Sequence, residues 1–293
     1  MKKYIVFLLT LTLSMGFTAC SDDDPSGTSI FSTATINRND FDRWLLKSYT
    51  YPYNIDFKYK MEDIESDMKY TLIPADLTKS AKLASIVKYL WLGAYDEVAG
   101  QDFTKSNVPR MINLVGSPAY NNNNTQVLGT AEGGLKVTLY KVNELDDAML
   151  HNYATLNLYY FHTMHHEFTH ILNQKKPYNT AFNQITESAY VSGDWYFVDN
   201  SAAHQAGFVT PYAMSEGTED FAEMLSVYVT TSSADWDALL TDAGTTGAPI
   251  IIQKLDYLRT YMQESWGIDI NQLRDVVLRR ASELSTLDLD YLK

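Results

Sequence analysis

The 293-residue chain contains a single cysteine, Cys20. One cysteine excludes an internal disulfide, a cysteine zinc site and an iron–sulfur cluster. Basic residues are also scarce, because 23 lysines and arginines stand against 36 acidic residues and give a net charge of −13. The basic residues form no cluster along the chain. Nucleic acids are therefore poor partners, since phosphate binding needs a basic surface.

The apolar run near the start of the chain is too short to span a membrane. It covers about residues 4–17, whereas a span needs about twenty apolar residues. The run follows Met1-Lys2-Lys3 and precedes Thr18-Ala19-Cys20, so residues 1–19 are expected to be a secretory signal peptide. The cysteine at the cleavage point resembles a bacterial lipobox, and this resemblance implies that Cys20 is lipidated.

Residues 20–30 are expected to form a flexible tether, because they are too polar to pack. Their acidic run, Asp22-Asp23-Asp24, resembles the surface-export signal of Bacteroidetes lipoproteins, although a plain solvated linker explains the same residues. The resemblance implies an outer-membrane lipoprotein exposed at the cell surface. Signal cleavage removes Lys2 and Lys3, which takes the formal net charge from −13 to −15. The lipid anchor is then the only expected contact with an anionic membrane.

Residues 31–293 are expected to form one domain, because they contain no repeat and no linker rich in Pro, Gly or Ser. Short apolar or alternating runs predict strands at Tyr53–Lys60, Met111–Val115, Gln126–Thr130 and Leu135–Val142. The last of these fits either an edge strand that pairs with an extended peptide or an interior strand. Helical spacing predicts helices at Thr78–Gly100, Asn152–Gln174, Ala181–Val191, Thr218–Thr230, Asp235–Asp242, Pro249–Trp266 and Asn271–Leu284. The expected fold class is α+β, with a small mixed sheet in the N-terminal part and a mainly helical C-terminal part.

The motif His166-Glu167-Phe168-Thr169-His170 lies inside the predicted helix Asn152–Gln174. Residues four apart on a helix share a face, with Cβ atoms about 6 Å apart, so both imidazoles can reach one metal ion. Glu167 projects from the neighbouring face and can contact a water at the metal. This is the zinc-protease arrangement, with the glutamate as general base. The expected cofactor is therefore Zn²⁺.

His162 lies one turn before His166, which makes a stripe of three histidines conceivable. Such a stripe rises about 11 Å over two turns, so one ion cannot bind both of its ends. We therefore expect His162 to hydrogen-bond near the site or to lie in the core, and not to be a ligand.

A third metal ligand is expected from a later element, because catalytic zinc usually has three protein ligands and a water. No Gly-x-x-His follows His170, which excludes the three-histidine metzincin pattern. Glu219 and Glu223 lie one turn apart on a predicted helix. One of them would bind zinc and the other would accept the free N–H of a ligand histidine. Glu187 and Glu216 are the alternative third ligands.

This spacing resembles that of the gluzincins, in which a glutamate on a later helix completes the zinc site. The interval of about fifty residues between His170 and Glu219 resembles the anthrax lethal factor branch more than thermolysin. The resemblance implies a zincin-like fold, with Glu219 as the third ligand and Glu223 as the hydrogen-bond partner of a histidine. That branch also has a tyrosine seven residues before the ligand glutamate, and Tyr212 occupies this position. Tyr212 would then hydrogen-bond the oxyanion formed during hydrolysis.

Most of the chain also resembles a zinc-metallopeptidase family of Bacteroidetes lipoproteins. The lipobox, the stretch Asn37–Leu45, the zinc helix and the Glu219 segment carry this resemblance. It implies a peptide or protein substrate, and an outer-membrane importer with its substrate-binding lipoproteins as partners. The expected activity is peptide hydrolysis by zinc-activated water. A zinc-bearing binding component without turnover, or a hydrolase of another amide or ester, remains an alternative.

Overall fold

The computed structural model describes residues 37–62, 65, 69–120, 126–127, 129–132 and 135–290. The signal peptide, Cys20 and the tether, which the sequence predicts at residues 1–30, lie outside these ranges. The chain divides into two units, Met1–Arg38 and Asn39–Lys293. Of the first unit only residues 37–38 are described, and they have no regular structure. The fold below is that of the second unit.

The main sheet has four strands in the order β1-β2-β6-β5, namely β1 (Asp56–Lys58), β2 (Met111–Leu114), β6 (Lys136–Leu139) and β5 (Gly129–Glu132). The first three strands are parallel and β5 runs antiparallel to β6, which confirms the predicted small mixed sheet. Three of the four residues in each of β2 and β6 are buried, as interior strands covered on both faces require. The predicted strand Leu135–Val142 thus forms an interior strand, and β5 occupies the edge.

A separate antiparallel pair is formed by β3 (Ala119–Tyr120) and β4 (Gln126–Val127). The predicted strand Tyr53–Lys60 is shorter in the structure. Its first residue ends a helix, and Asn54 then adopts a left-handed conformation with φ of 58°, so the strand begins only at Asp56.

Helices precede and follow β1 in the N-terminal part. These are α2 (Asp40–Leu45), η1 (Leu46–Thr50), α3 (Tyr51–Tyr53), α4 (Leu77–Val87), η3 (Lys88–Leu92), α5 (Gly93–Ala99) and α6 (Gln101–Asn107). Asn39 caps α2 and Asp76 caps α4, each through a side-chain oxygen that accepts a backbone N–H three residues later. The predicted helix Thr78–Gly100 corresponds to the continuous stretch from α4 to α5.

The C-terminal part is helical, as predicted. It contains η4 (Val142–Glu144), α7 (Asp147–Leu150), α8 (Tyr153–Leu156), η5 (Asn157–Phe161), α9 (His162–Lys175), α10 (Ala181–Gln184), η6 (Glu187–Ala189), η7 (Ser192–Phe197), α11 (Asn200–Gln205), η8 (Tyr212–Met214), α12 (Gly217–Thr230), α13 (Ser233–Trp266), α14 (Ile270–Ser282) and η9 (Leu284–Thr286). The predicted helix Ala181–Val191 is wrong beyond Gln184, because Thr186 leaves the helical conformation (φ −131°). The two helices predicted around Gly244 are joined as α13 with a kink at that glycine (φ 65°).

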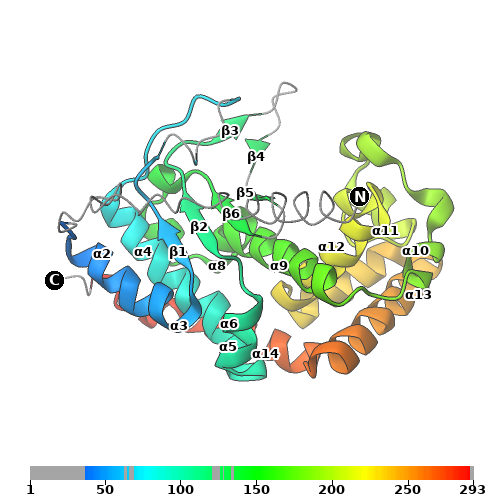
Figure 1. The fold of residues 1–293 in the computed structure, drawn as a ribbon. Helices are drawn as coiled ribbons and strands as arrows, with labels where there is room; N and C mark the ends of the chain where they lie inside the picture. Colours follow the sequence, from blue (N-terminus) through cyan, green and yellow to red (C-terminus); the bar gives the residue numbers. More distant parts are fainter. Residues whose placement is uncertain are drawn as a thin grey trace, which may run out of the picture. The chain divides into compact units, whose positions relative to one another are not determined.

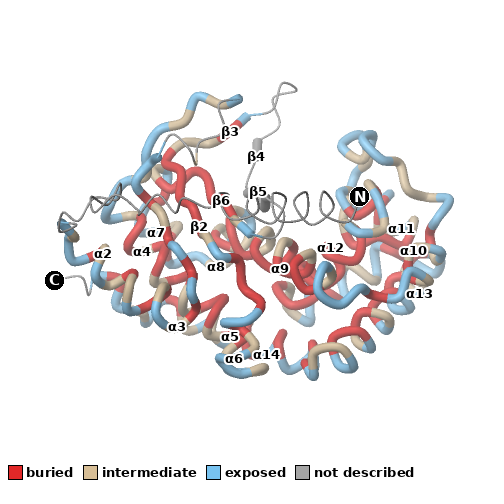
Figure 2. Tube along the Cα trace, viewed as in Figure 1, coloured by how far each residue is buried: buried red, intermediate tan, exposed pale blue. Residues whose placement is uncertain are grey.

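Helix α9 crosses the centre of this unit, with the sheet on one side and α10, α11 and α13 on the other (Figure 1). Helix α12 packs along α9; α12 is mainly buried and about half of α9 is buried (Figure 2). Lys254 of α13 and Asp220 of α12 form a buried ion pair at 2.6 Å, which joins α13 to α12. In the ranges that the structure describes, no helix has both the length and the apolar character to cross a membrane.

Candidate metal centre

Two packed helices, α9 and α12, carry the chemical groups of the site. On α9, His166 and His170 occupy one face at a spacing of four residues. The opposite face is fixed in the core by Phe168, whose ring lies 5.4 Å from that of Trp91 and 4.7 Å from that of Tyr95. This apolar anchoring fixes the rotation of α9 and therefore the direction of its two imidazoles.

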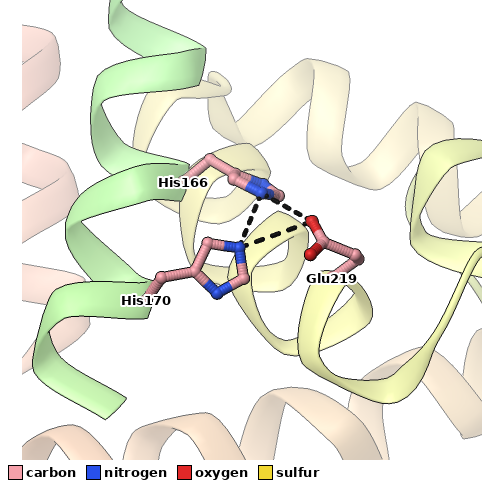
Figure 3. Close-up of side chains that lie close together, drawn as sticks. All are labelled: His166, His170 and Glu219. Carbon is pink, nitrogen blue, oxygen red and sulfur yellow. Dashed lines mark hydrogen bonds and ion pairs between the residues drawn. The ribbon is translucent and has the colours of Figure 1, made fainter. Parts of the chain in front are cut away.

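The side chains of His166, His170 and Glu219 converge at one point between the helices (Figure 3). Oε2 of Glu219 lies 2.9 Å from Nε2 of His166 and 3.4 Å from Nε2 of His170. The two Nε2 atoms lie 3.0 Å apart. The packing of α12 on α9 thus brings together three metal-binding atoms from residues about fifty positions apart.

This group of three residues fits a zinc ion. Two imidazoles and one carboxylate form a donor set found in catalytic zinc sites, which leave the fourth position open. Tetrahedral bonds of about 2.0–2.2 Å place neighbouring ligand atoms about 3.3 Å apart. The observed separations of 2.9 to 3.4 Å are close to that value.

Glu223 lies one turn after Glu219 and is buried behind the imidazole of His166. Its Oε1 accepts hydrogen bonds from Nδ1 of His166 at 2.7 Å and from Nε2 of His162 at 2.8 Å. Its Oε2 accepts from the hydroxyl of Thr210 at 2.6 Å. A proton held on Nδ1 leaves Nε2 of His166 free to bind a metal.

Electrostatics keep both carboxylates of this face ionised. Burial alone would raise the pKa of Glu219 and of Glu223, but their imidazole partners hold both pKa values below the usual range. Burial alone would lower the pKa of His166, but hydrogen bonds with the two glutamates outweigh it and raise the pKa to about 10. His166 therefore holds a proton on Nε2 as well at neutral pH, and a metal ion that binds Nε2 displaces this proton.

Glu167 lies beside His166, His170 and Glu219, here called the metal-binding group, but is not part of it. Within the described part of the chain, its carboxylate has no hydrogen bond and no ion pair. Burial raises its pKa, and this effect exceeds the opposing influence of the two imidazoles. A carboxylate whose pKa is raised in this way is a better proton acceptor than an ordinary glutamate, which suits a general base.

Tyr212 lies at the edge of the site, on the short helix η8. Its ring centroid is 5.7 Å from that of His166, and about a third of its side chain is exposed. Burial raises the pKa of Tyr212, and the carboxylate of Glu219 adds to this effect. The phenol therefore stays protonated at neutral pH and can donate a hydrogen bond.

The other candidate ligands lie away from the group. Glu187 is exposed on η6, and Glu216 is exposed at the start of α12, where its carboxylate accepts from the hydroxyl of Thr218. His162 contacts Glu223 and is not part of the metal-binding group. His165 is buried on the core side of α9, where its Nδ1 lies 2.9 Å from the hydroxyl of Tyr95.

The structure adds Thr210 and Asp220 to the surroundings of the site, and the sequence alone did not indicate them. Thr210 binds Glu223, and its hydroxyl also accepts the backbone N–H of Ala213 at 3.1 Å. Asp220 follows Glu219 and accepts from Lys254 and from the hydroxyl of Tyr190. No motif marks these residues, because their partners lie in other elements of the fold.

Comparison with known proteins agrees with this geometry. A family model described as "Putative zinc-binding metallo-peptidase" matches residues 34–271. A crystal structure of a "putative zinc-binding metallo-peptidase" from Bacteroides caccae ATCC 43185 is 46% identical and has a TM-score of 0.77, covering 90% of this chain and 100% of that one. No curated protein matches the chain. The chain therefore belongs to this family of zinc-binding metallopeptidases.

Proposed function

We propose that the chain is a zinc-dependent peptidase. The observation that carries this proposal is the convergence of the metal-binding atoms of His166, His170 and Glu219, with the carboxylate of Glu167 close enough to interact electrostatically with both imidazoles. These three residues would hold the zinc ion, which when bound supplies a Lewis acid for attack by water on a carbonyl. The family description and the relative from Bacteroides caccae support the same assignment.

The residues around the ion have separate roles in this proposal. Glu223 holds the proton on Nδ1 of His166 and so orients the ring. The carboxylate of Glu167 takes a proton from the attacking water and passes it to the leaving amine nitrogen. The phenol of Tyr212 donates a hydrogen bond to the carbonyl oxygen as negative charge develops on it.

Replacement of Glu167 by Gln tests this proposal. The variant should keep one zinc ion per chain in metal analysis but lose peptide hydrolysis by at least about 100-fold, since the proton acceptor is gone. The matched control is Glu187→Gln, an exposed glutamate away from the group, which should retain activity. Hydrolysis retained in Glu167→Gln would contradict the role of this residue. Zinc binding without hydrolysis in the wild type would favour a binding component instead.

We also propose that a lipid on Cys20 anchors the protein in the outer membrane, with the peptidase domain exposed at the cell surface. The lipobox-like residues before Cys20 and the acidic run after it support this location. An importer and its substrate-binding lipoproteins would then lie within reach as partners. Labelling with a fatty acid analogue should mark the wild type and not Cys20→Ala, and external protease should remove the domain from intact cells. A labelled Cys20→Ala variant or a protected domain would reject the corresponding part of the proposal.

A further inference from the structure

Three consecutive aromatic residues, Trp195, Tyr196 and Phe197, lie on η7 close to the turn that carries Tyr212. Neighbouring rings are in contact: the centroid of Trp195 lies 5.1 Å from that of Tyr212 and 6.2 Å from that of Tyr196. The rings of Tyr196 and Phe197 follow at 4.0 Å. Since Tyr212 also contacts His166, these four aromatic residues, here called the aromatic row, connect the metal-binding group to the surface.

The aromatic row is held in place at both ends of η7. The backbone N–H of Val191 donates to the carbonyl of Met214 at 2.8 Å, which ties the start of η7 to the Tyr212 turn. Val198 donates to the carbonyl of Trp195 at 3.0 Å, and both valines pack against the core. The position of the aromatic row relative to the metal-binding group is therefore set by the fold.

The outer rings of the aromatic row are uncovered in this structure. The exposed fraction is 48% for Tyr196 and 75% for Phe197. The segment between α10 and α11 that carries them is largely drawn as exposed in Figure 2. Single exposed apolar residues are common, but adjoining rings beside a chemical site mark a binding surface. Covering such rings removes apolar area from water, which favours a ligand with an apolar group of its own.

Two properties limit which ligands can bind the aromatic row: the charge of the segment that carries it and its distance from the metal-binding group. The stretch from Val191 to Asn200 carries two acidic residues, Asp194 and Asp199, and no basic one. A negatively charged side chain is therefore disfavoured here. The two ring contacts between His166 and Trp195 span a distance that two or three residues of extended peptide cover at about 3.3 Å each.

We propose that Trp195, Tyr196 and Phe197 form a subsite that binds an aromatic or large apolar side chain of a peptide substrate, on one side of the cleaved bond. This inference rests on the proposed peptidase function and names the substrate class that the site prefers. The continuity of the aromatic row with the metal-binding group supports a substrate side chain as the occupant.

The test uses eight-residue Ala/Ser peptides in which a single phenylalanine is moved along the sequence. The zinc-loaded full chain is incubated with each peptide, and products are quantified by mass spectrometry. The wild type should prefer one phenylalanine position by at least about ten-fold in kcat/KM over the peptide without phenylalanine. Phe197→Ala and Tyr196→Ala should each reduce this preference. The matched control is Tyr51→Ala, which removes another exposed ring (69%) on α3 and should leave the preference unchanged.

A binding measurement separates failure of the subsite from failure of the peptidase proposal. Calorimetry with zinc-loaded Glu167→Gln should show tighter binding of the preferred phenylalanine peptide, and adding Phe197→Ala should weaken it. If the phenylalanine peptide binds more tightly but the wild type hydrolyses no peptide, the proposed peptidase function is rejected and the proposed subsite is retained. Equal affinity for both peptides, or a preference that both ring variants leave unchanged, would overturn the subsite. Binding of an oligosaccharide in place of any peptide preference would overturn it as well.

Discussion

Oε1 of Glu223 lies 2.7 Å from Nδ1 of His166, on the side of the ring opposite Nε2, which faces Glu219. Both glutamates come from α12, one turn apart, so a single helix places one carboxylate on each nitrogen of the same imidazole. One carboxylate is directed at the metal position and the other fixes the proton on the ring. Two chemically identical side chains therefore contact opposite nitrogens of one ring and have different roles.

Removing the carboxylate of Glu219 should abolish stable zinc binding. In Glu219→Ala only two imidazoles remain, and a catalytic zinc usually needs three protein ligands. Metal analysis after dialysis against a weak chelator should give about one zinc per wild-type chain and far less in the variant. Glu216→Ala and Glu187→Ala remove exposed carboxylates elsewhere and should bind zinc as the wild type does. Loss of zinc from either control would point to a different third ligand.

Changing Glu223 to Gln should weaken zinc binding without abolishing it. The amide is a poorer acceptor for Nδ1 of His166, and loss of such outer partners typically costs 10- to 100-fold in metal affinity. Competition with a chromophoric chelator measures the change. An unaltered zinc affinity would show that the hydrogen bond between Nδ1 of His166 and Glu223 does not contribute to metal binding.

Thr210 should matter for turnover more than for metal binding. Its hydroxyl bridges Glu223 and the backbone of Ala213, next to Tyr212. Thr210→Val keeps the shape but removes both hydrogen bonds, so kcat should fall roughly ten-fold while zinc content is retained. Thr210→Ser restores the hydroxyl and should recover most of the rate. If the serine variant is as slow as the valine variant, packing of the methyl group is the cause instead.

The buried ion pair between Lys254 and Asp220 should be essential for stability. Lys254→Met leaves a buried carboxylate without its cation, which costs about 3–5 kcal/mol in the free energy of unfolding. Urea unfolding measures this loss. Lys60→Met removes an exposed lysine that pairs with Asp42, and it should cost less than about 1 kcal/mol. The double variant Lys254→Met/Asp220→Asn should recover part of the loss, and a further loss would contradict this account.

Glu97 should give a small acid-dependent contribution to stability. Burial alone would raise its pKa, but hydrogen bonds from Arg280 and Arg279 hold the pKa below the usual value of 4.5. The folded pKa lies below the unfolded one, so the contribution is present above about pH 4.5 and is lost as the pH falls through the folded pKa. Since these groups are well exposed, solvent limits the effect to less than about 1 kcal/mol. The difference in unfolding free energy between wild type and Glu97→Gln should shrink on acidification. A difference that does not change with pH would show that folding does not lower the pKa of Glu97.

Local patterns predicted the longer helices of the structure, α4, α9, α12, α13 (as two helices) and α14, but not α2, α6, α7 or α11. The spacing of apolar residues predicted α12 to within one residue at its start, and the stretch from α8 to α9 likewise. The predicted helix Ala181–Val191 stops at Gln184, and the residues that follow form the turns that lead to η7. The run Trp195-Tyr196-Phe197 is visible in the sequence, but its position beside Tyr212 is not.

The sequence alone determined that His166 and His170 share a face, because helix geometry fixes the direction of side chains four residues apart. It could not choose among Glu187, Glu216 and Glu219 as the third ligand without a family resemblance, since none of them lies on the helix that carries the two histidines. Only the packing of α12 along α9 decided which carboxylate meets the imidazoles. That packing depends on apolar contacts summed over both helices and their neighbours, and no local stretch of sequence contains this information.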